Sequence, residues 1–395
     1  METALKQKMK VMEGSIAIAE TVTQLRPHVI SAYPITPQTH IVEALSRIVA
    51  DGRLHADFIK VDSEQSAASA CVGASAAGAR AYTATTSQGL LLMAEVLFSM
   101  AGMRLPVLLT CVNRSVSSPL SIWNDHQDSM TVRDSGWIQL YAEDNQEAID
   151  MHVQGYKIAE KVKLPLMICI DGFLLTHTYE PLRLYDQDEI DKFVPPYKPK
   201  YHLTPKDPHT FGCFAEPDKY TEFRYMTAHA NLDSKSEIVA VAKEFKEVFG
   251  RFTGDLLENY KCDDADTVLV GMGTIVSILK AVADQMREEG KKVGVCKIRT
   301  FRPFPKEEIR NSLKDKKNIV IFDKSLSMGL GSIVGTDVKD ALYGLSSAKI
   351  STIIAGLAGR DIPVSSVKKM VEKAEKQVLD NEFMDLKTEL LGGEI

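Results

Sequence analysis

From about residue 28 to residue 175 the sequence alternates between short apolar segments and helix-forming segments, and this alternation restricts the fold more than any other feature. Strands that are separated by helices pair in parallel, and their sheet needs helices on both faces. The pattern therefore predicts an α/β protein with a doubly wound parallel sheet. The strands are expected at residues 28–31, 58–61, 82–88, 105–112 and 165–171.

Residues 58–114 carry the side chains that suggest chemistry. Glu64 follows an apolar strand, and almost every residue from 66 to 79 is Ala, Ser, Gly or Cys. A helix of such small residues can approach a neighbouring backbone or a flat ligand closely. Sheets of this type bind their ligands at the carboxyl ends of the strands, so we expect an active-site crevice there. The residues expected at this edge are Glu64, Ser87, Gln88, Asn113 and Arg114.

The segment Tyr33-Pro34-Ile35-Thr36-Pro37 interrupts the first of these strands abruptly. A proline on each side of the Ile35-Thr36 pair restricts φ and would hold the Thr36 hydroxyl in a rigid turn at a strand end. A plain connection between a strand and a helix would use the same residues. From these residues alone, both interpretations remain open.

Residues 115–139 form a polar stretch that contains both tryptophans of the chain. The run Asp125-His126-Gln127-Asp128 could indicate a metal site or an acid–base pair. A loop with many mutual hydrogen bonds, or a surface for a partner, is the favoured interpretation, because long charged loops between apolar elements usually serve function or an interface. We therefore predict no metal ligand in this chain.

Length, charge and cysteine usage narrow the classes of protein further. A chain of 395 residues is expected to form roughly two or three domains. We predict one domain at 1–235, with a proline-rich segment that wraps over its surface from about 181, and an α/β domain at 236–395. A net charge of −6 argues against nucleic acid as a partner.

The six cysteines are scattered without a C-x-x-C pair, so the chain lacks a ligand set for an iron–sulfur cluster or a structural zinc. The N-terminus does not resemble a signal peptide, and no apolar run approaches the ~20 residues of a membrane span. These features predict a cytoplasmic protein with no membrane contact. The pair Gly271-x-Gly273 lacks the third glycine of the dinucleotide fingerprint, which argues against NAD.

Nine motifs occur in a fixed order over nearly the whole length: YPITP (33–37), VDSE-x-SA (61–67), GASAAGAR (73–80), TSQG (86–89), NR-x-x-S-x-P (113–119), IWNDHQDSM (122–130), RDSGWIQLYAEDNQEA (133–148), RTFRPFP (299–305) and GLAGRDIP (356–363). Together they resemble the α subunit of the multi-subunit 2-oxoacid:ferredoxin oxidoreductases, of which pyruvate:ferredoxin oxidoreductase is the familiar member. The resemblance implies a pyrimidine-type thiamine diphosphate domain followed by a transketolase C-terminal-like α/β domain.

The resemblance also implies roles for single residues. Glu64 would bind the pyrimidine ring nitrogen of thiamine diphosphate and activate the cofactor, with Ser87 and Gln88 beside it. Thr36 and Arg114 would bind the carboxylate of a small 2-oxo acid, for which a bidentate guanidinium is well suited. Further residues of the pocket or its support would be Pro34, Ile35, Gln65, Ser115, Ser117, Asn124 and Asp125.

Partner chains are expected as well. The Gly-Asp-Gly pattern with a later Asn, which anchors the diphosphate in thiamine enzymes, is absent; Asp171-Gly172 lacks the leading glycine. The resemblance thus implies that other subunits hold the diphosphate, Mg²⁺ and the [4Fe–4S] clusters, and that ferredoxin accepts the electrons. We expect a dimer of heterotrimers or a similar assembly, with the active site at a subunit interface.

Two departures from the pyruvate enzymes bear on the substrate. Gln65 stands where a His would be expected, and residues 114–119 read Arg-Ser-Val-Ser-Ser-Pro in place of Arg-Ala-Leu-Ser-Ala-Pro. A more polar pocket suits a substrate with two carboxylates, so the sequence favours an oxalate oxidoreductase that needs no coenzyme A. Pyruvate oxidation to acetyl-CoA is the alternative. A transketolase-type or E1 β-type thiamine subunit, and a binding subunit without catalysis, remain as more distant possibilities.

Overall fold

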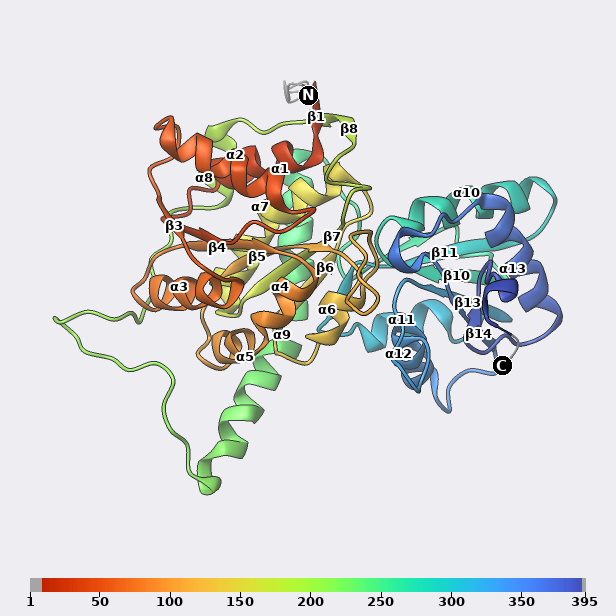
Figure 1. Cartoon of the computed structure of the whole chain (residues 1–395). Coiled ribbons are helices and arrows are strands. Elements are labelled where there is room, and N and C mark those ends of the chain that lie inside the picture. Colours follow the sequence, from red (N-terminus) through yellow and green to blue (C-terminus); the bar gives the residue numbers. More distant parts are fainter. Residues whose placement is uncertain (1–8, 393–395) are drawn as a thin grey trace. The chain divides into compact units, whose positions relative to one another are not determined.

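The computed structural model describes residues 9–392, which form two compact units (Figure 1). The first unit extends through Leu256 and also includes Arg299–Pro305, whereas the second comprises Leu257–Ile298 and the chain from Lys306 onward. The boundary expected between residues 235 and 236 falls inside one continuous helix, α9 (Pro217–Phe249). The chain leaves the first unit only after that helix has ended.

The first unit is built on a seven-stranded sheet with the order β12-β6-β7-β5-β4-β2-β3. All neighbours are parallel except β12, which pairs antiparallel with β6. The expected doubly wound parallel sheet is confirmed, and its central strands are buried because helices cover both faces. The strands are β2 (Val29–Ala32), β3 (Asp57–Lys60), β4 (Ala81–Thr85), β5 (Leu108–Asn113), β6 (Ile138–Tyr141), β7 (Leu166–Asp171) and β12 (Thr300–Arg302).

Figure 1 shows α1, α2 and α7 on one face of this sheet and α3, α4 and α5 on the other. A two-stranded antiparallel sheet of β1 (Met9–Glu13) and β8 (Tyr179–Arg183) lies next to α1. The helices of the unit are α1 (Gly14–Gln24), α2 (Thr39–Ala50), α3 (Glu64–Ala76), α4 (Ser87–Leu92), α5 (Ala94–Gly102), α6 (Gln127–Thr131), α7 (Asn145–Val162), α8 (Gln187–Phe193) and α9.

The strand order reverses between β2 and β4. From β2 the chain crosses to β3 on one side and then returns to form β4 on the other. In open α/β sheets such a switch point leaves a crevice outside the carboxyl ends of the two strands. The turn after β2 contains Thr36, and the turn after β4 contains Ser87, so both predicted residues lie at this crevice.

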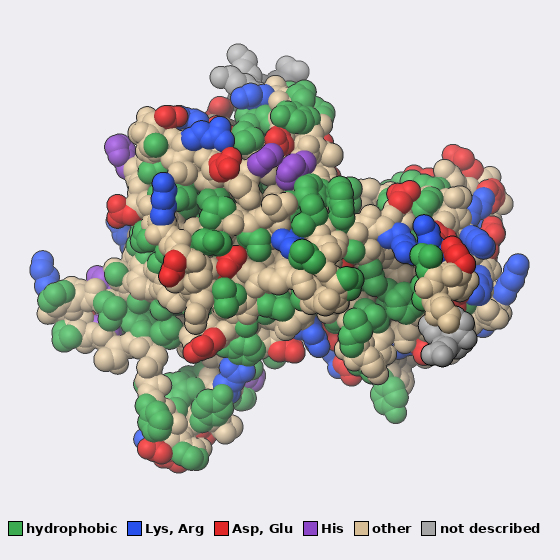
Figure 2. Space-filling view, in the orientation of Figure 1, with side chains coloured by type: hydrophobic (Ala, Val, Ile, Leu, Met, Phe, Trp, Pro, Cys, Tyr) green, Lys and Arg blue, Asp and Glu red, His purple; other side chains and the backbone are tan. Residues whose placement is uncertain are grey.

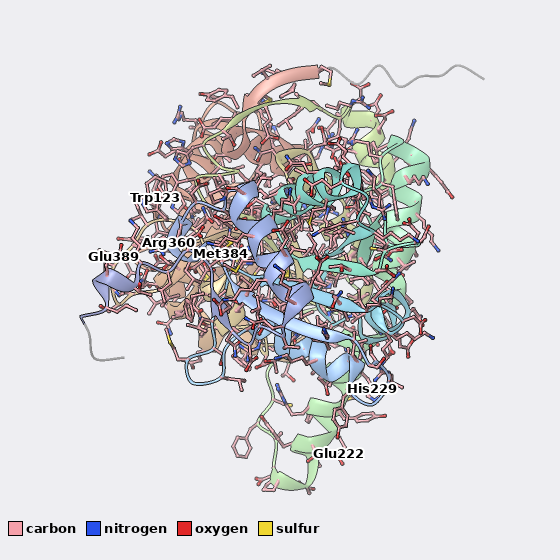
Figure 3. All side chains as sticks on the ribbon, turned by 90° about the vertical axis from the view of Figure 1, so that its right-hand side faces the viewer. Trp123, Glu222, His229, Arg360, Met384 and Glu389 are labelled. Atoms are coloured by element: carbon pink, nitrogen blue, oxygen red, sulfur yellow. The ribbon has the colours of Figure 1, made fainter. Side chains whose placement is uncertain are left out.

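The segment expected to wrap over the surface, residues 181–235, is only partly irregular. It contains α8, and from Pro217, a favoured residue in a first helical turn, it becomes the exposed first half of α9. Figure 3 shows Glu222 and His229 on the part of α9 that projects from the unit. Figure 2 shows apolar side chains on this projection beside charged ones, and Phe214, just before α9, is 88% exposed.

The second unit contains a six-stranded sheet with the order β15-β14-β13-β10-β11-β9, parallel except for β9. Its strands are β9 (Leu257–Tyr260), β10 (Thr267–Gly271), β11 (Val293–Ile298), β13 (Asn318–Asp323), β14 (Lys349–Ile354) and β15 (Glu382–Phe383). Its helices are α10 (Ile275–Glu288), α11 (Lys306–Leu313), α12 (Ile333–Leu342) and α13 (Val364–Lys376), with short 3₁₀ turns η1 (Leu357–Gly359) and η2 (Thr388–Leu390). Among residues 9–392, no helix combines the length and apolar character that crossing a bilayer requires.

Candidate active site

Glu64 is the first residue of α3 and lies at the crevice side of the sheet. Ser63 caps this helix, because its hydroxyl accepts a hydrogen bond of 3.2 Å from the backbone N–H of Ser66. The Glu64 side chain is buried, with 7% of the residue exposed. Its carboxylate forms no hydrogen bond or ion pair with any residue from 9 to 392. A buried carboxylate without a partner is costly, so Glu64 is poised to bind a group from outside the described chain.

Gly89 of α4 makes room for this carboxylate. A Cβ atom at residue 89 would lie 2.8 Å from Glu64 Oε1 and 2.6 Å from Thr85 Oγ1. Neither distance is compatible with a side chain at that position unless its neighbours move. The glycine of the TSQG motif therefore allows α3 and α4 to approach one another around Glu64.

The structure brings the two predicted substrate-binding residues together. Arg114 follows β5, and its Nη1 donates a hydrogen bond of 2.8 Å to the backbone oxygen of Thr36. Its Nε donates to the backbone oxygen of Ser121 at 3.0 Å. Burial lowers the pKa of the Arg114 guanidinium, and the nearby Asp128 carboxylate opposes this shift. The side chain remains a cation at neutral pH, with Nη2 left for a further acceptor.

Four more predicted residues form one cluster between the ends of β4 and β5. The Ser87 hydroxyl lies within hydrogen-bond distance of the backbone oxygen of Ser115 and of Gln88 Oε1. Gln88 Nε2 in turn donates to the Ser117 hydroxyl. Ser87 has a φ of 47°, which is unusual for a residue with a side chain. These contacts hold the turn after β4 against the turn after β5.

Asp128, in the short helix α6, belongs to the acidic run noted in the sequence but was not among the predicted site residues. Its Oδ2 accepts hydrogen bonds from the backbone N–H of Ser87 (2.8 Å) and of Arg114 (3.0 Å). Its Oδ1 accepts from Asn113 Nδ2 and from the Ser129 N–H, both at 2.8 Å. The side chain is fully buried, so one carboxylate joins the ends of β4 and β5 to α6.

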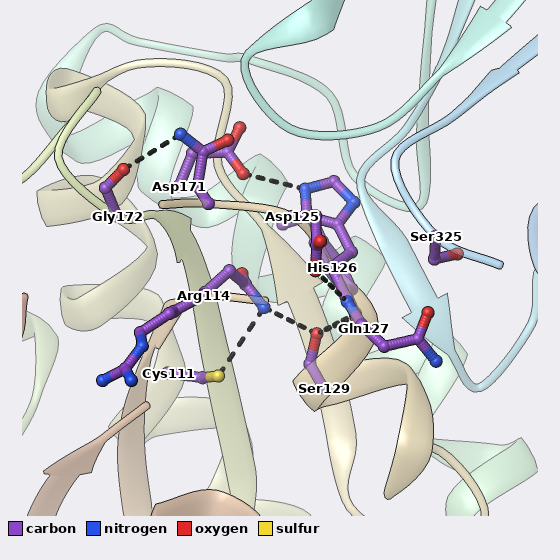
Figure 4. A network of polar contacts seen from close by, with 12 residues as sticks. Cys111, Arg114, Asp125, His126, Gln127, Ser129, Asp171, Gly172 and Ser325 are labelled. Atoms are coloured by element: carbon purple, nitrogen blue, oxygen red, sulfur yellow. Dashed lines mark hydrogen bonds and ion pairs between the residues drawn. The ribbon is translucent and has the colours of Figure 1, made fainter. Parts of the chain in front are cut away.

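The segment before α6 is held against the end of β7. The buried His126 and Asp171 face one another (Figure 4), with 3.0 Å between Nε2 and Oδ1. Asn124 Nδ2 donates to the backbone oxygen of Gly172 at 3.1 Å, and Asp125 accepts from the Gln127 N–H at 3.0 Å. Among residues 9–392, no group of three or more His, Cys, Asp or Glu side chains could hold a metal ion. Within the run, Asp125 accepts from the Gln127 N–H, while His126 and Asp128 bind residues outside it.

Three predicted residues take part in none of these contacts. Gln65 is exposed on α3, and Ile35 is half-buried and contacts Gln38 through its backbone N–H. Pro34 lines a cavity of about 470 Å³ between α2 and β3. That cavity is lined by Ala32, Tyr33, Pro34, Val42, Glu43, Ser46, Arg47, Phe58, Lys60 and Val61. It includes none of Glu64, Thr36 or Arg114, so it is separate from the cluster of site residues.

Two family models match the chain. Residues 20–243 match the model described as "Pyruvate flavodoxin/ferredoxin oxidoreductase, thiamine diP-bdg", and residues 265–367 match "Pyruvate:ferredoxin oxidoreductase core domain II". The fold and these matches define a thiamine diphosphate-binding oxidoreductase subunit. The chain belongs to the 2-oxoacid:ferredoxin oxidoreductase family, and within it to the α-subunit type represented by PorA and VorA.

Curated relatives match over almost the whole length. The chain is 50% identical to pyruvate synthase subunit PorA of Methanosarcina barkeri, over 99% of this chain and all of the relative. It is 44% identical to ketoisovalerate oxidoreductase subunit VorA of Pyrococcus horikoshii, over 93% of this chain and 94% of the relative. The fold also matches the 2-oxoglutarate:ferredoxin oxidoreductase of Magnetococcus marinus, with a TM-score of 0.72 at 19% identity. That match covers 93% of this chain and 65% of the other.

Proposed function

We propose that this chain binds the pyrimidine ring of thiamine diphosphate and the carboxylate of a small 2-oxo acid in a multi-subunit oxidoreductase, with pyruvate as the substrate. The observation that carries the proposal is the buried Glu64 carboxylate, which has no partner among residues 9–392 and faces Gly89. Gly89 gives the carboxylate room in this position, where it is left to accept a hydrogen bond from a ligand.

Glu64 would act through a hydrogen bond to a ring nitrogen. When bound, thiamine diphosphate supplies a carbon nucleophile that attacks the 2-oxo group and stabilises the electrons left by decarboxylation. Because the Glu64 carboxylate is shielded from water, its hydrogen bond to the ring would be stronger than a similar bond in water. The residue would thereby control where the ring holds its proton.

Arg114 and Thr36 would hold the carboxylate of the substrate. The guanidinium is fixed by two backbone oxygens, those of Thr36 and Ser121, so its orientation is set before a substrate arrives. The Thr36 side chain is exposed at the same turn and offers a hydroxyl donor. A fixed cation at this position would select an anionic substrate and orient its neighbouring carbonyl carbon.

The remaining groups would come from partner subunits. Among residues 9–392, no three His, Cys, Asp or Glu side chains are grouped so that they could hold a metal ion. The cysteines of the chain form no disulfide bonds, and most of them are buried. We propose that other subunits hold the diphosphate, Mg²⁺ and the [4Fe–4S] clusters, and that ferredoxin receives the electrons. The relatives are named as single subunits, PorA and VorA, and these names support an assembly of several chains.

The choice of substrate rests on two unequal arguments. Relatives that are 43–50% identical to this chain are named for pyruvate and for ketoisovalerate. The substitutions at Gln65 and at residues 115–118 were the reason to favour oxalate. In this chain Gln65 and Ser117 are exposed and lie apart from the Arg114 guanidinium contacts, so their polarity is weaker evidence than the relatives.

Anaerobic dye reduction by the purified complex would test the proposal. Pyruvate, ketoisovalerate and oxalate are supplied in parallel, each with and without coenzyme A. Reduction that needs both pyruvate and coenzyme A supports the proposal. Preferred use of ketoisovalerate, or reduction by oxalate without coenzyme A, would show that pyruvate is not the substrate. The proposed class of enzyme, a thiamine diphosphate-dependent oxidoreductase, would still hold. Reduction with none of the three would contradict the proposed activity.

Replacing Glu64 by Gln tests the role of its carboxylate. We expect turnover to fall by roughly 100-fold or more, because proton control of this kind is worth about 10²–10⁴ in rate. Subunit assembly, measured by size-exclusion chromatography, should not change. The exposed Glu43→Gln on α2 is the matched control and should retain full activity. Equal activities of the two variants would show that the Glu64 carboxylate is not used.

A further inference from the structure

Asp128 connects the two turns that carry the predicted cofactor and substrate residues. Both N–H groups that meet Oδ2, those of Ser87 and Arg114, follow different strands, β4 and β5. Ser87 belongs to the proposed cofactor side and Arg114 to the proposed substrate side. One carboxylate oxygen thus joins the two sides, in addition to the contacts of Ser87 with Ser115 and of Gln88 with Ser117.

The hydrogen bonds of Asp128 require an ionised carboxylate. All five groups that contact its oxygens are donors: three backbone N–H groups, the amide of Asn113 and the Cys111 thiol, whose Sγ lies 3.8 Å from Oδ2. A carboxylate accepts at every lone pair, whereas an amide or a protonated carboxyl would direct a hydrogen toward one of these donors. The isosteric asparagine cannot reproduce this arrangement, because it replaces one of the two accepting oxygens by an NH₂ group, which is itself a donor.

The conformation of Ser87 also depends on this contact. At a φ of 47° a residue with a side chain is strained, and such a conformation persists only where the surroundings fix it. The Ser87 N–H is fixed by Asp128, and the Ser87 hydroxyl lies against the Ser115 backbone oxygen. Loss of the first contact would leave a buried N–H without an acceptor and would release the turn.

We propose that Asp128 is a positioning residue that sets the placement of the Arg114 guanidinium relative to the cofactor ring beside Glu64. It touches neither substrate nor cofactor and acts through the backbone of Ser87 and Arg114. The inference rests on the proposed function, because it concerns the geometry of that site. It adds a residue from α6 to the predicted site residues.

The pH dependence of the site follows from the same carboxylate. Burial raises the pKa of Asp128 to about 6, against the opposing hydrogen bonds from Asn113, Ser87, Arg114 and Ser129. Three titratable or charged groups lie around it: Arg114, Cys111 and Tyr141. Cys111 and Tyr141 stay neutral, because burial raises the pKa of each. Activity should therefore fall as the pH drops through about 6, when the ionised form that the donors need is lost.

Stability should behave in the opposite way. The pKa of Asp128 in the folded chain is higher than its ordinary value of 3.8, so the folded state binds this proton more tightly than the unfolded state. The contribution of this group to the free energy of unfolding therefore increases as the pH falls from above 6 toward 4. A loss of activity on acidification that precedes unfolding would distinguish positioning from general destabilisation.

The test compares Asp128→Asn with Asp150→Asn in the assembled complex. Asp150 is also a buried carboxylate of this unit, but it binds Arg251 and Tyr185 and contacts no site residue. We expect D128N to lower kcat/KM at least about 100-fold, and to speed hydrogen–deuterium exchange in peptides that contain Ser87 and Arg114. D150N should lower the melting temperature without either effect.

Three outcomes separate the possibilities. If wild-type complex is active and D128N stays within about threefold of its kcat/KM, the positioning role is wrong while the proposed function holds. If D128N and D150N lose activity in step with their melting temperatures, Asp128 is only structural, which also overturns the inference. If the wild type neither binds thiamine diphosphate nor turns over a 2-oxo acid, the proposed function fails before the variants are compared.

A milder variant covers the case in which D128N does not assemble. Asn113→Ala removes one hydrogen bond that lowers the pKa of Asp128, so that pKa should rise. The acid limb of the kcat/KM profile should then move to higher pH. An acid limb that stays in place, in a variant that folds and binds thiamine diphosphate, would contradict the role of Asp128.

Discussion

At the scale of single residues, the candidate site depends on close packing around one acid. Glu64 lacks a partner among residues 9–392, and its carboxylate reaches its position because Gly89 has no side chain. Both residues lie in motifs that resemble the family, Glu64 in VDSE-x-SA and Gly89 in TSQG, but only Glu64 was predicted as a site residue. The reason for the glycine, a contact between two helices, required the structure.

Replacing Gly89 by Ala should disturb the site directly. The new methyl group would meet Thr85 Oγ1 at 2.6 Å and Glu64 Oε1 at 2.8 Å, so the carboxylate must move. We expect thiamine diphosphate affinity to fall by about tenfold, an estimate that assumes the loss of about one hydrogen bond. Isothermal titration of the complex with the cofactor measures this change.

Gly73→Ala in α3 is the control for that variant. A Cβ atom at residue 73 meets nothing within 4 Å, and alanine is favoured over glycine inside a helix by about 0.5–1 kcal/mol. It should leave cofactor affinity unchanged and raise stability slightly. Equal affinities for both variants would show that the space at Gly89 is not needed by Glu64.

Asp128 shows where sequence reasoning stops. Its neighbours in the chain, His126 and Gln127, suggested a hydrogen-bonded loop, and the structure has one. Its partners Ser87 and Arg114, however, are backbone groups that follow separate strands. Almost every residue has a backbone N–H, so the sequence does not indicate which of these groups bind a side chain. Only the folded sheet shows that the Asp128 carboxylate accepts hydrogen bonds from these two.

At the scale of elements, α3 is defined more by its cap than by an apolar stripe. Its small side chains give little amphipathic pattern, but the N-cap Ser63 fixes the start of the helix and hence the position of Glu64. Such a start could be predicted from the sequence, because serine before an acidic first turn is a typical helix signal.

Replacing Ser63 by Ala should lower the free energy of unfolding by about 1 kcal/mol, the usual cost of losing an N-cap. Urea unfolding followed by circular dichroism measures the change. Ser69→Ala, at an exposed position within the same helix, should instead stabilise it by up to about 0.5 kcal/mol. If both substitutions have the same effect, the Ser63 hydroxyl does not act as a cap.

The helix α9 was harder to predict. Apolar residues at helical spacing occur where it packs on the unit, for example at Ile238, Val241 and Phe245, and there the sequence indicated a helix. The first half, from Pro217, is largely exposed and has no stripe that faces a core. Without burial there is no periodicity to detect, so the apolar spacing of the sequence predicts a helix over residues 234–260, whereas α9 covers Pro217–Phe249.

At the scale of the whole molecule, the chain passes between its two units more than once. Arg299–Pro305 returns to the first unit and adds β12 to the edge of its sheet. The buried Arg299 anchors this return, with Nε 3.2 Å from Glu147 Oε1 and Nη2 3.0 Å from Gln154 Oε1. The motif at 299–305 was visible in the sequence, but its placement in the first unit was not, because local patterns do not reveal which sheet a short strand joins.

Replacing Arg299 by Met should lower the free energy of unfolding of the first unit by about 3–5 kcal/mol, since it leaves the buried Glu147 carboxylate without its cation. Arg47→Met, which removes an exposed pair with Glu43 on α2, should cost about 0.5 kcal/mol or less. Chemical denaturation monitored by the fluorescence of the buried Trp137 compares them. A small effect of R299M would show that the return strand is held by its backbone pairing alone.

The return of Arg299–Pro305 also limits how a gene for such a protein could be divided. A cut after Leu256 would release a first unit whose sheet ends at β6, with backbone N–H and C=O groups that β12 normally pairs. Such an open edge favours aggregation, so a split gene would need to keep the strand on the same polypeptide. The strand β12 lies between the two sequence segments of the second unit. A recombination that exchanged residues 257–395 between related proteins would therefore also exchange this strand. Substitutions in β12 and in the β6 edge of the first unit would then have to be compatible.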